Sequence, residues 1–247
     1  MITSVLYSIL AAFGDVLGGL LVIGPLARDT SSRRHQLLLS GLVAFGGGFM
    51  LAVAFLEMLP PAFALEGGAG MTAVLVGYLV VHLTQHMLTP HFHFGQETHS
   101  EAMVSRGIGI WALAGLLPHS FFDGVAISSA FLESRDLGLL VFGAVLLHKV
   151  PTGASLASIM IASGNTAKNA LIAVALIAAA TVLGALLTPT LDTLARFGLA
   201  VSAGVTIYVA ASNLIPEAQR ERGLIIPSGV FLGVFAFYLI RLLLPHG

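Results

Sequence analysis

The sequence predicts an all-α integral membrane protein with eight transmembrane helices. Hydrophobic residues make up 57% of the 247 positions and charged residues only 9%, whereas about a quarter of a soluble domain is charged. The mean hydropathy is +0.96. Apolar stretches of about 20 residues, which is the length that a helix needs to cross hydrocarbon, recur along the whole chain.

Polar or Gly/Pro-rich segments separate these stretches and define each predicted span in turn. The separating segments are "ARDTSSRRH", "PPAFALEGGAG", "TPHFHFGQETHSEAMVSR", "ESRD", "GNTAK", "TPTLDTLAR" and "QRERG". The spans therefore lie at about 4–26, 37–59, 71–89, 107–131, 138–162, 169–188, 197–217 and 224–244. All separating segments except the third are short, so residues 1–247 form a single transmembrane domain with a His-bearing loop at about 90–106.

The first span is expected to remain in the protein. It lacks the basic segment that opens a signal peptide, and it is too long for one.

The distribution of basic residues predicts that both termini lie outside the cell, in the cytoplasmic membrane. Basic side chains favour the cytoplasmic side of short loops. With the N-terminus outside, seven basic loop residues lie inside and three outside. The inner set is Arg28, Arg33, Arg34, Arg106, Lys168, Arg220 and Arg222; the outer set is Arg135, Arg196 and Arg241.

The second and seventh spans resemble each other in sequence. Residues 48–62, "GFMLAVAFLEMLPPA", align without gaps to 204–218, "GVTIYVAASNLIPEA". The shared residues are Gly48/Gly204, Val53/Val209, Ala54/Ala210, Pro60/Pro216 and Ala62/Ala218. The two spans run in opposite directions, so the match predicts an inverted repeat of the kind found in secondary transporters. The alternative is that small residues recur by chance in membrane helices.

Two proline-containing motifs place polar groups near the middle of the fourth and fifth spans. In "LLPHSFFDG", His119 and Asp123 are four residues apart and share one helix face. In "LLHKVPTG", His148 and Thr152 have the same spacing. Charged groups in hydrocarbon cost at least about 2.5–3.5 kcal/mol on insertion scales, so they usually have a function. A single intramembrane His can be a hydrogen-bonded packing residue, but paired motifs at one depth favour a polar site in the bilayer.

This site suits a divalent transition metal. Histidine nitrogen and carboxylate oxygen bind Zn²⁺ and related ions, and the sequence contains no Cys that could provide thiolate ligands.

The motifs "HSFFDG" (119–124) and "HKVPTG" (148–153) resemble those of the ZIP (Zrt/Irt-like) divalent-metal transporters, here of the prokaryotic type. The resemblance extends to "LEMLP", to "YVAASNLIPEA" and to the His-bearing loop. It implies a 3+2+3 arrangement of helices with spans one to three and six to eight as inverted repeats. It also implies transport of a divalent metal toward the cytoplasm, with Zn²⁺ as the first candidate for the metal. The resemblance further implies that the protein is a homodimer.

Carried over position by position, the resemblance makes His119, Asp123 and His148 metal ligands, and Met50 matches a thioether ligand of some relatives. The chain departs from the family pattern at Ser120, which replaces Asn, at Lys149, which replaces an acid, at Thr152, which replaces Glu or His, and at Asn213, which replaces Glu. The usual acidic side chain of the sixth span is also missing, since no Asp or Glu lies between Asp136 and Asp192. We expect the Lys149 ammonium to occupy the place of a second metal and to balance Asp123, which leaves a site for one ion.

Further polar residues are predicted to tune or extend the pathway. His82 and His86 lie toward the inner end of the third span, ahead of the loop histidines, and together they could pass a metal to the cytosol. Glu57 lies near the outer end of the second span and is a candidate entrance group, and Asp15 has no obvious partner. A solvated polar loop is the alternative for the histidines.

Three alternatives remain open on the sequence. In the first, Lys149 and Asp123 form a structural ion pair in a homologue with an altered substrate. In the second, the protein is an intramembrane zinc hydrolase, although the sequence lacks H-E-x-x-H. In the third, it is a structural membrane protein. We expect a metal ion and lipid as partners, no nucleic acid, no permanently bound cofactor and no enzymatic activity.

Overall fold

A computed structural model describes residues 2–23, 33–87, 106–219 and 224–243, and within these ranges the chain is almost entirely helical. The α-helices are α1 (Ile2–Ile23), α2 (Arg33–Val53), α3 (Leu59–Phe63), α4 (Ala69–Met87), α5 (Arg106–Glu133), α6 (Arg135–Ala162), α7 (Ala167–Leu187), α8 (Asp192–Tyr208), α9 (Ile215–Ala218) and α10 (Ile225–Leu243). Two π-helical segments, Ala54–Met58 and Val209–Leu214, join α2 to α3 and α8 to α9.

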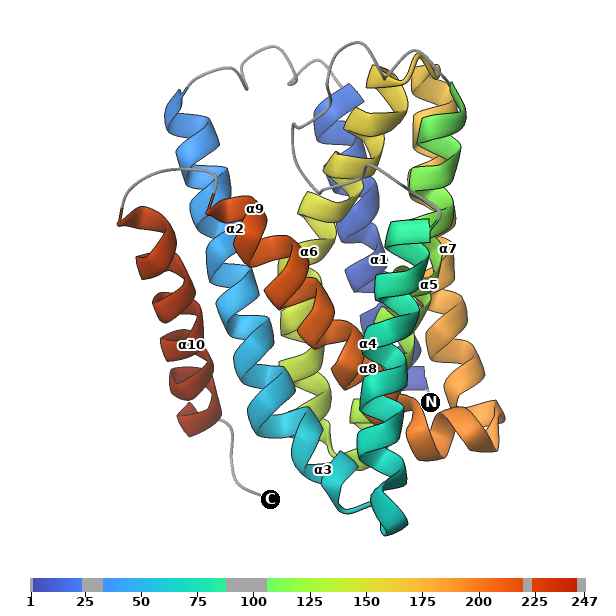
Figure 1. Cartoon of the computed structure of the whole chain (residues 1–247), viewed down its shortest axis with the longest axis vertical. Helices are drawn as coiled ribbons and strands as arrows, with labels where there is room; N and C mark the ends of the chain where they lie inside the picture. Colours follow the sequence, from blue (N-terminus) through green and yellow to red (C-terminus); the bar gives the residue numbers. More distant parts are fainter. Residues whose placement is uncertain (1, 24–32, 88–105, 220–223, 244–247) are drawn as a thin grey trace.

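The helices have the length and apolarity of a multi-pass membrane protein. Seven segments in the described part of the chain are long and apolar enough to cross a bilayer, and α4 contributes a shorter apolar segment, Ala69–Gln85. Successive long helices run in alternating directions, and α1 begins at the end of the bundle at which α10 finishes (Figure 1). The predicted spans agree with these helices to within a few residues.

Helices α5 and α6 form the central pair of the bundle. They pack against each other; α1 packs on α6 and α7 on α5, while α2 pairs with α10 and α4 with α8. Short turns fix the ends of α6: Ser134 accepts a hydrogen bond from the Leu137 amide, 3.1 Å away, and Gly164 after α6 has φ of +83°. The two helices that carry the proline motifs are therefore surrounded by protein.

Reciprocal close contacts confirm the inverted repeat and extend it beyond the aligned segment. A Cβ at Gly48 would overlap the Val230 carbonyl, and one at Gly204 would overlap the Val74 carbonyl. Gly48 and Gly204 are 156 positions apart, and so are Val74 and Val230, which is the offset that aligns 48–62 with 204–218. The same offset relates Gly77 against Val201 to Gly233 against Phe45. Helices α2 and α8 run in opposite directions in Figure 1, as an inverted repeat requires.

The two π-helical segments also occupy equivalent positions. Each segment ends two residues before a proline. Pro60 follows Ala54–Met58, and Pro216 follows Val209–Leu214. Proline has no amide hydrogen for the usual bond to the residue four positions earlier, so the backbone is free to adopt a wider turn. The repeat thus conserves a backbone irregularity as well as small residues.

Candidate metal site

Three buried side chains from the central helix pair converge on one point. His119 and Asp123 project from adjacent turns of α5, and His148 projects from α6. Asp123 Oδ2 lies 3.4 Å from His119 Nε2 and 3.3 Å from His148 Nε2. The imidazole centroids are 5.3 Å apart, and one ligand atom from each residue lies within 4.8 Å of the others.

Each of the two helices that carry the site contains a proline, which frees one backbone carbonyl a turn earlier. Pro118 and Pro151 lie inside continuous helices, so the carbonyls one turn earlier, of Ala114 and Leu147, lack the usual backbone amide donor. Such freed carbonyls are tolerated in a membrane protein where they are enclosed by protein or line a cavity.

The spacing of each imidazole nitrogen from the Asp123 carboxylate oxygen fits a transition-metal ion. Atoms bonded at about 2.0–2.1 Å to a tetrahedral ion lie about 3.3–3.4 Å apart. The two imidazole-to-carboxylate distances, 3.4 and 3.3 Å, match this separation between two ligand atoms. Two nitrogens and one oxygen leave a position for a fourth ligand, which is the donor set of an open Zn²⁺ site.

A hydrogen bond to the backbone orients His148. Its Nδ1 lies 3.1 Å from the Ala144 carbonyl oxygen, and because a carbonyl only accepts, Nδ1 carries the proton in this contact. The other ring nitrogen, Nε2, faces the carboxylate oxygen Oδ2 of Asp123 over 3.3 Å. A backbone bond of this kind fixes the orientation of a histidine ring, and it leaves Nε2 as the atom that can bind a metal.

Lys149 adjoins the same carboxylate and is completely buried. Its Nζ lies 3.0 Å from Asp123 Oδ2 and 3.0 Å from Asp15 Oδ2, and it donates a hydrogen bond of 2.7 Å to Thr181 Oγ1. The sequence offered no obvious partner for Asp15, and the structure supplies one, because α1 places its carboxylate against Lys149. The pairing with Thr181 on α7 had no signal in the sequence.

The other residues predicted near the site have separate environments. Thr152 donates to the His148 carbonyl over 2.8 Å. Ser120 Oγ and His119 Nδ1 are buried and have no hydrogen-bond partner among the described residues. Met50 is buried at 1% exposure in the main hydrophobic cluster, and its role as a ligand stays a prediction.

The residues predicted to line the pathway make contacts away from the His119, Asp123 and His148 group. Asn213 donates to Gln85 over 3.1 Å, and Arg241 of α10 pairs with Glu57 over 2.9 Å. His82 is exposed and makes ring contacts with Tyr78 and Tyr208. The side chain of His86 and the loop histidines His91, His93 and His99 lie outside the described residues. The pathway roles of all these residues stay predictions.

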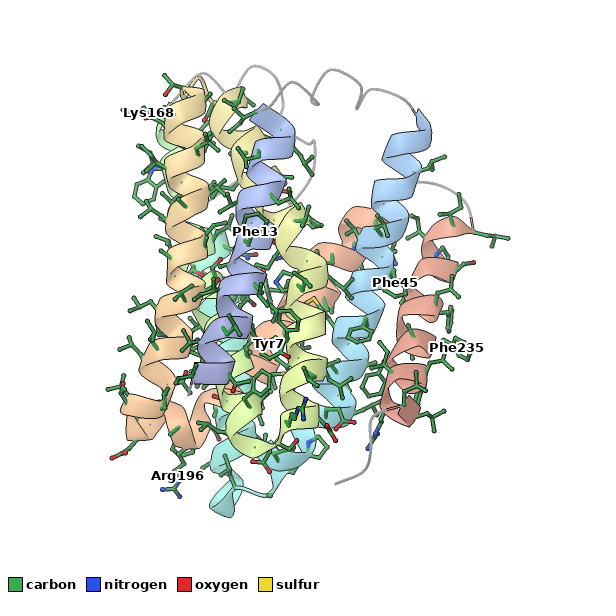
Figure 2. The ribbon with its side chains drawn as sticks, turned by 180° about the vertical axis from the view of Figure 1, so that it is seen from behind. Tyr7, Phe13, Phe45, Lys168, Arg196 and Phe235 are labelled. Carbon is green, nitrogen blue, oxygen red and sulfur yellow. The ribbon has the colours of Figure 1, made fainter. Side chains whose placement is uncertain are left out.

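A cavity of about 210 Å³ opens at the end of the bundle where α1 begins. It is lined by Ser129, Leu132 and Glu133 of α5, residues of α8 that include Arg196, and Pro61, Ala62 and Leu65. Arg196 marks this lower end in Figure 2, opposite Lys168. Ten residues of α5 separate Glu133 from Asp123, which corresponds to about 15 Å along the helix.

The comparison with protein families agrees with this geometry. A family model described as ZIP zinc transporter matches residues 93–241, which is more than half of the chain and includes both motifs. No curated protein matches the sequence. Members of the matched family are transporters, which removes the hydrolase alternative. On the strength of this match, and consistent with its buried His-Asp-His group, the chain belongs to the ZIP zinc transporter family of membrane proteins that carry metal ions.

Proposed function

We propose that the protein carries a divalent transition-metal cation, with Zn²⁺ as the first candidate, through a site for one ion formed by His119, Asp123 and His148. The observation that carries this proposal is the convergence of three buried N and O donors from two helices, with both imidazole-to-carboxylate distances at the spacing of a tetrahedral ion. Met50, or a water that enters with the ion, supplies the fourth ligand.

The charge beside the site supports a single ion. Lys149 Nζ already lies within hydrogen-bond distance of Asp123 Oδ2. A second dication in the place of the ammonium would add positive charge without adding a carboxylate. The two metal ions would then repel each other strongly, because the site is buried. Lys149 therefore substitutes for a second ion and lowers the affinity for the first, which favours release.

Transport proceeds from the cavity end toward the opposite end of the bundle in this proposal. Glu133 provides a carboxylate at the cavity, and Ser129 lies further along α5 in the direction of Asp123. The distribution of basic residues assigns this end to the cell exterior and the His-bearing loop to the cytoplasm. The proposal is therefore uptake across the cytoplasmic membrane, and the homodimer that the family resemblance implies stays a prediction.

A second function is favoured by one observation. The Lys149–Asp123 contact of 3.0 Å already neutralises the only acid of the three-residue group. If this ion pair is purely structural, the protein is a transporter homologue with an altered substrate.

Flux through the site can be measured in vesicles. Purified protein is reconstituted around a metal-sensitive dye, and Zn²⁺ influx is compared for the wild type, His119→Ala and Asp192→Asn. We expect His119→Ala to abolish influx because it removes one of three ligands, and the exposed Asp192→Asn to transport normally. Influx that is the same in His119→Ala and the wild type would assign transport to another site and support the second function.

A further inference from the structure

The surroundings of Lys149 involve four different helices. Its ammonium contacts Asp15 of α1, Asp123 of α5 and Thr181 of α7, and it projects from α6 itself. Lys149 and Asp15 are both 0% exposed, and Asp123 is 3% exposed. These charges cannot be screened by water, so the position of each determines the field at the metal ligands.

The net charge beside the two imidazoles depends on Asp15. Two carboxylates and one ammonium leave one net negative charge beside His119 and His148. Without the Asp15 charge, the ammonium would be left with Asp123 alone, and the pair would have no net charge to attract a dication. An entering metal would then have to displace the ammonium from the carboxylate oxygen that both imidazoles face.

The inverted repeat shows how the ammonium is held. A Cβ at Gly153 would overlap the Asp15 carbonyl, and one at Gly124 would overlap the Thr181 carbonyl. The repeat exchanges α1 with α7 and α6 with α5, so Asp15 and Thr181 occupy equivalent positions in the two halves.

The same exchange places Lys149 opposite Ser120. The ammonium therefore contacts equivalent residues of both halves, the carboxylate of Asp15 in one and the hydroxyl of Thr181 in the other.

We propose that Asp15 is a positioning residue of the metal site: it shares the Lys149 ammonium with Asp123 at equal distance, 3.0 Å, and so leaves negative charge on Asp123 available to the metal. The proposal rests on the function proposed above. Asp15 does not bind the ion. It sets the affinity for the ion through Lys149.

Cobalt binding tests this role on the purified full-length protein. Co²⁺ reports its ligands through its visible absorption, and its affinity is obtained by titration. We expect Asp15→Asn to weaken Co²⁺ binding about tenfold or more, because one unit of nearby negative charge is lost, with the shape of the spectrum unchanged. Asp192→Asn is the matched control, an Asp→Asn change at an exposed position that should bind as the wild type does.

The repeat supplies a rescue variant. In Asp15→Asn combined with Thr181→Asp, the carboxylate moves to the equivalent position on α7, where the present hydroxyl already accepts from Lys149 at 2.7 Å. We expect the double variant to recover most of the lost Co²⁺ affinity. A second combination, Asp15→Asn with Lys149→Met, removes both charges and is also expected to bind more tightly than Asp15→Asn alone.

The outcomes separate this inference from the proposed function. If Asp15→Asn lowers thermal stability but binds Co²⁺ with wild-type affinity, Asp15 is only structural and the inference is wrong. The same holds if affinity falls and neither double variant recovers it. If the wild type itself binds no Co²⁺, or if His119→Ala leaves its spectrum unchanged, the proposed metal site fails instead.

Discussion

At the scale of single residues, the site centres on one oxygen atom. Asp123 Oδ2 faces the nitrogens of His119, His148 and Lys149 at 3.4, 3.3 and 3.0 Å. Two of these nitrogens belong to imidazoles, which can bind a metal, and the third belongs to an ammonium, which cannot. In the proposed site, Asp123 is therefore shared between the metal and a fixed cation of the protein, and we expect affinity to depend on it most.

Asp123→Asn should eliminate metal binding while the protein still folds. The amide is a poor ligand, and it removes the negative charge that attracts the ion. Lys149 retains Asp15, so the loss of stability should stay below the about 3–5 kcal/mol that follows when a buried charge loses its partner entirely. Isothermal titration with Zn²⁺ and thermal unfolding in detergent measure the two effects. Zn²⁺ binding that survives within a few fold would contradict this assignment.

At the scale of elements, close packing of helices places the charges. Helix α1 approaches α6 through Gly14 and Gly18, and a Cβ at Gly153 of α6 would overlap the Asp15 carbonyl. Small residues at such crossings let backbones approach in a membrane, where no hydrophobic effect drives the helices together. The same crossing brings Asp15 within reach of Lys149.

Gly153→Ala should therefore separate α1 from α6. Overpacking of this kind costs about 1–3 kcal/mol, and transport should fall as Asp15 moves away from Lys149. Gly143→Ala on the same helix is the control, since its nearest contact would be Phe49 at 3.8 Å, an ordinary packing distance. Thermal unfolding and dye-monitored influx should distinguish the two variants, and equal behaviour would argue against the crossing as the cause.

At the scale of the whole molecule, two halves of opposite orientation surround one central helix pair. Helices α2 and α10 pack as α4 and α8 do, and α1 packs on α6 as α7 packs on α5. The proposed ligands His119, Asp123 and His148 lie on the central pair, between the two halves. This arrangement suits alternating access, in which a fixed site opens first to one side and then to the other.

The orientation of the molecule can be tested with introduced cysteines, because the sequence has none. Glu133 lines the cavity at the lower end of the bundle, and Lys168 is exposed at the opposite end. We expect a membrane-impermeant maleimide to label Glu133→Cys in intact cells, and Lys168→Cys only after permeabilisation. The reverse pattern would overturn the orientation that the basic residues predict.

Much of the fold could be predicted from the sequence because lipid imposes simple rules. A helix must be about 20 residues long and apolar to cross the bilayer, so composition and spacing gave the spans to within a few residues. The spacing of His119 and Asp123 placed both on one face of a helix, and the match of "HSFFDG" and "HKVPTG" to a family placed His148 beside them. The alignment of 48–62 with 204–218 found one part of the inverted repeat.

These rules could not predict which residues contact Lys149. The sequence suggested Asp123 but left Asp15 without a partner and gave Thr181 no role. These residues lie 134 and 32 positions from Lys149, and no periodicity links them. One signal was present: Asp15 and Lys149 are opposite charges inside predicted spans, and buried charges are usually paired.

The sequence by itself determined where the apolar helices lie and which polar side chains occur inside them, because hydrophobic length and side-chain chemistry are local properties of the chain. Only the tertiary structure decided that one carboxylate oxygen serves two imidazoles and an ammonium, and that Asp15 shares that ammonium. The physical reason is that these contacts depend on how closely α1, α5, α6 and α7 cross, and such distances follow from glycines at contacts between helices far apart in the chain.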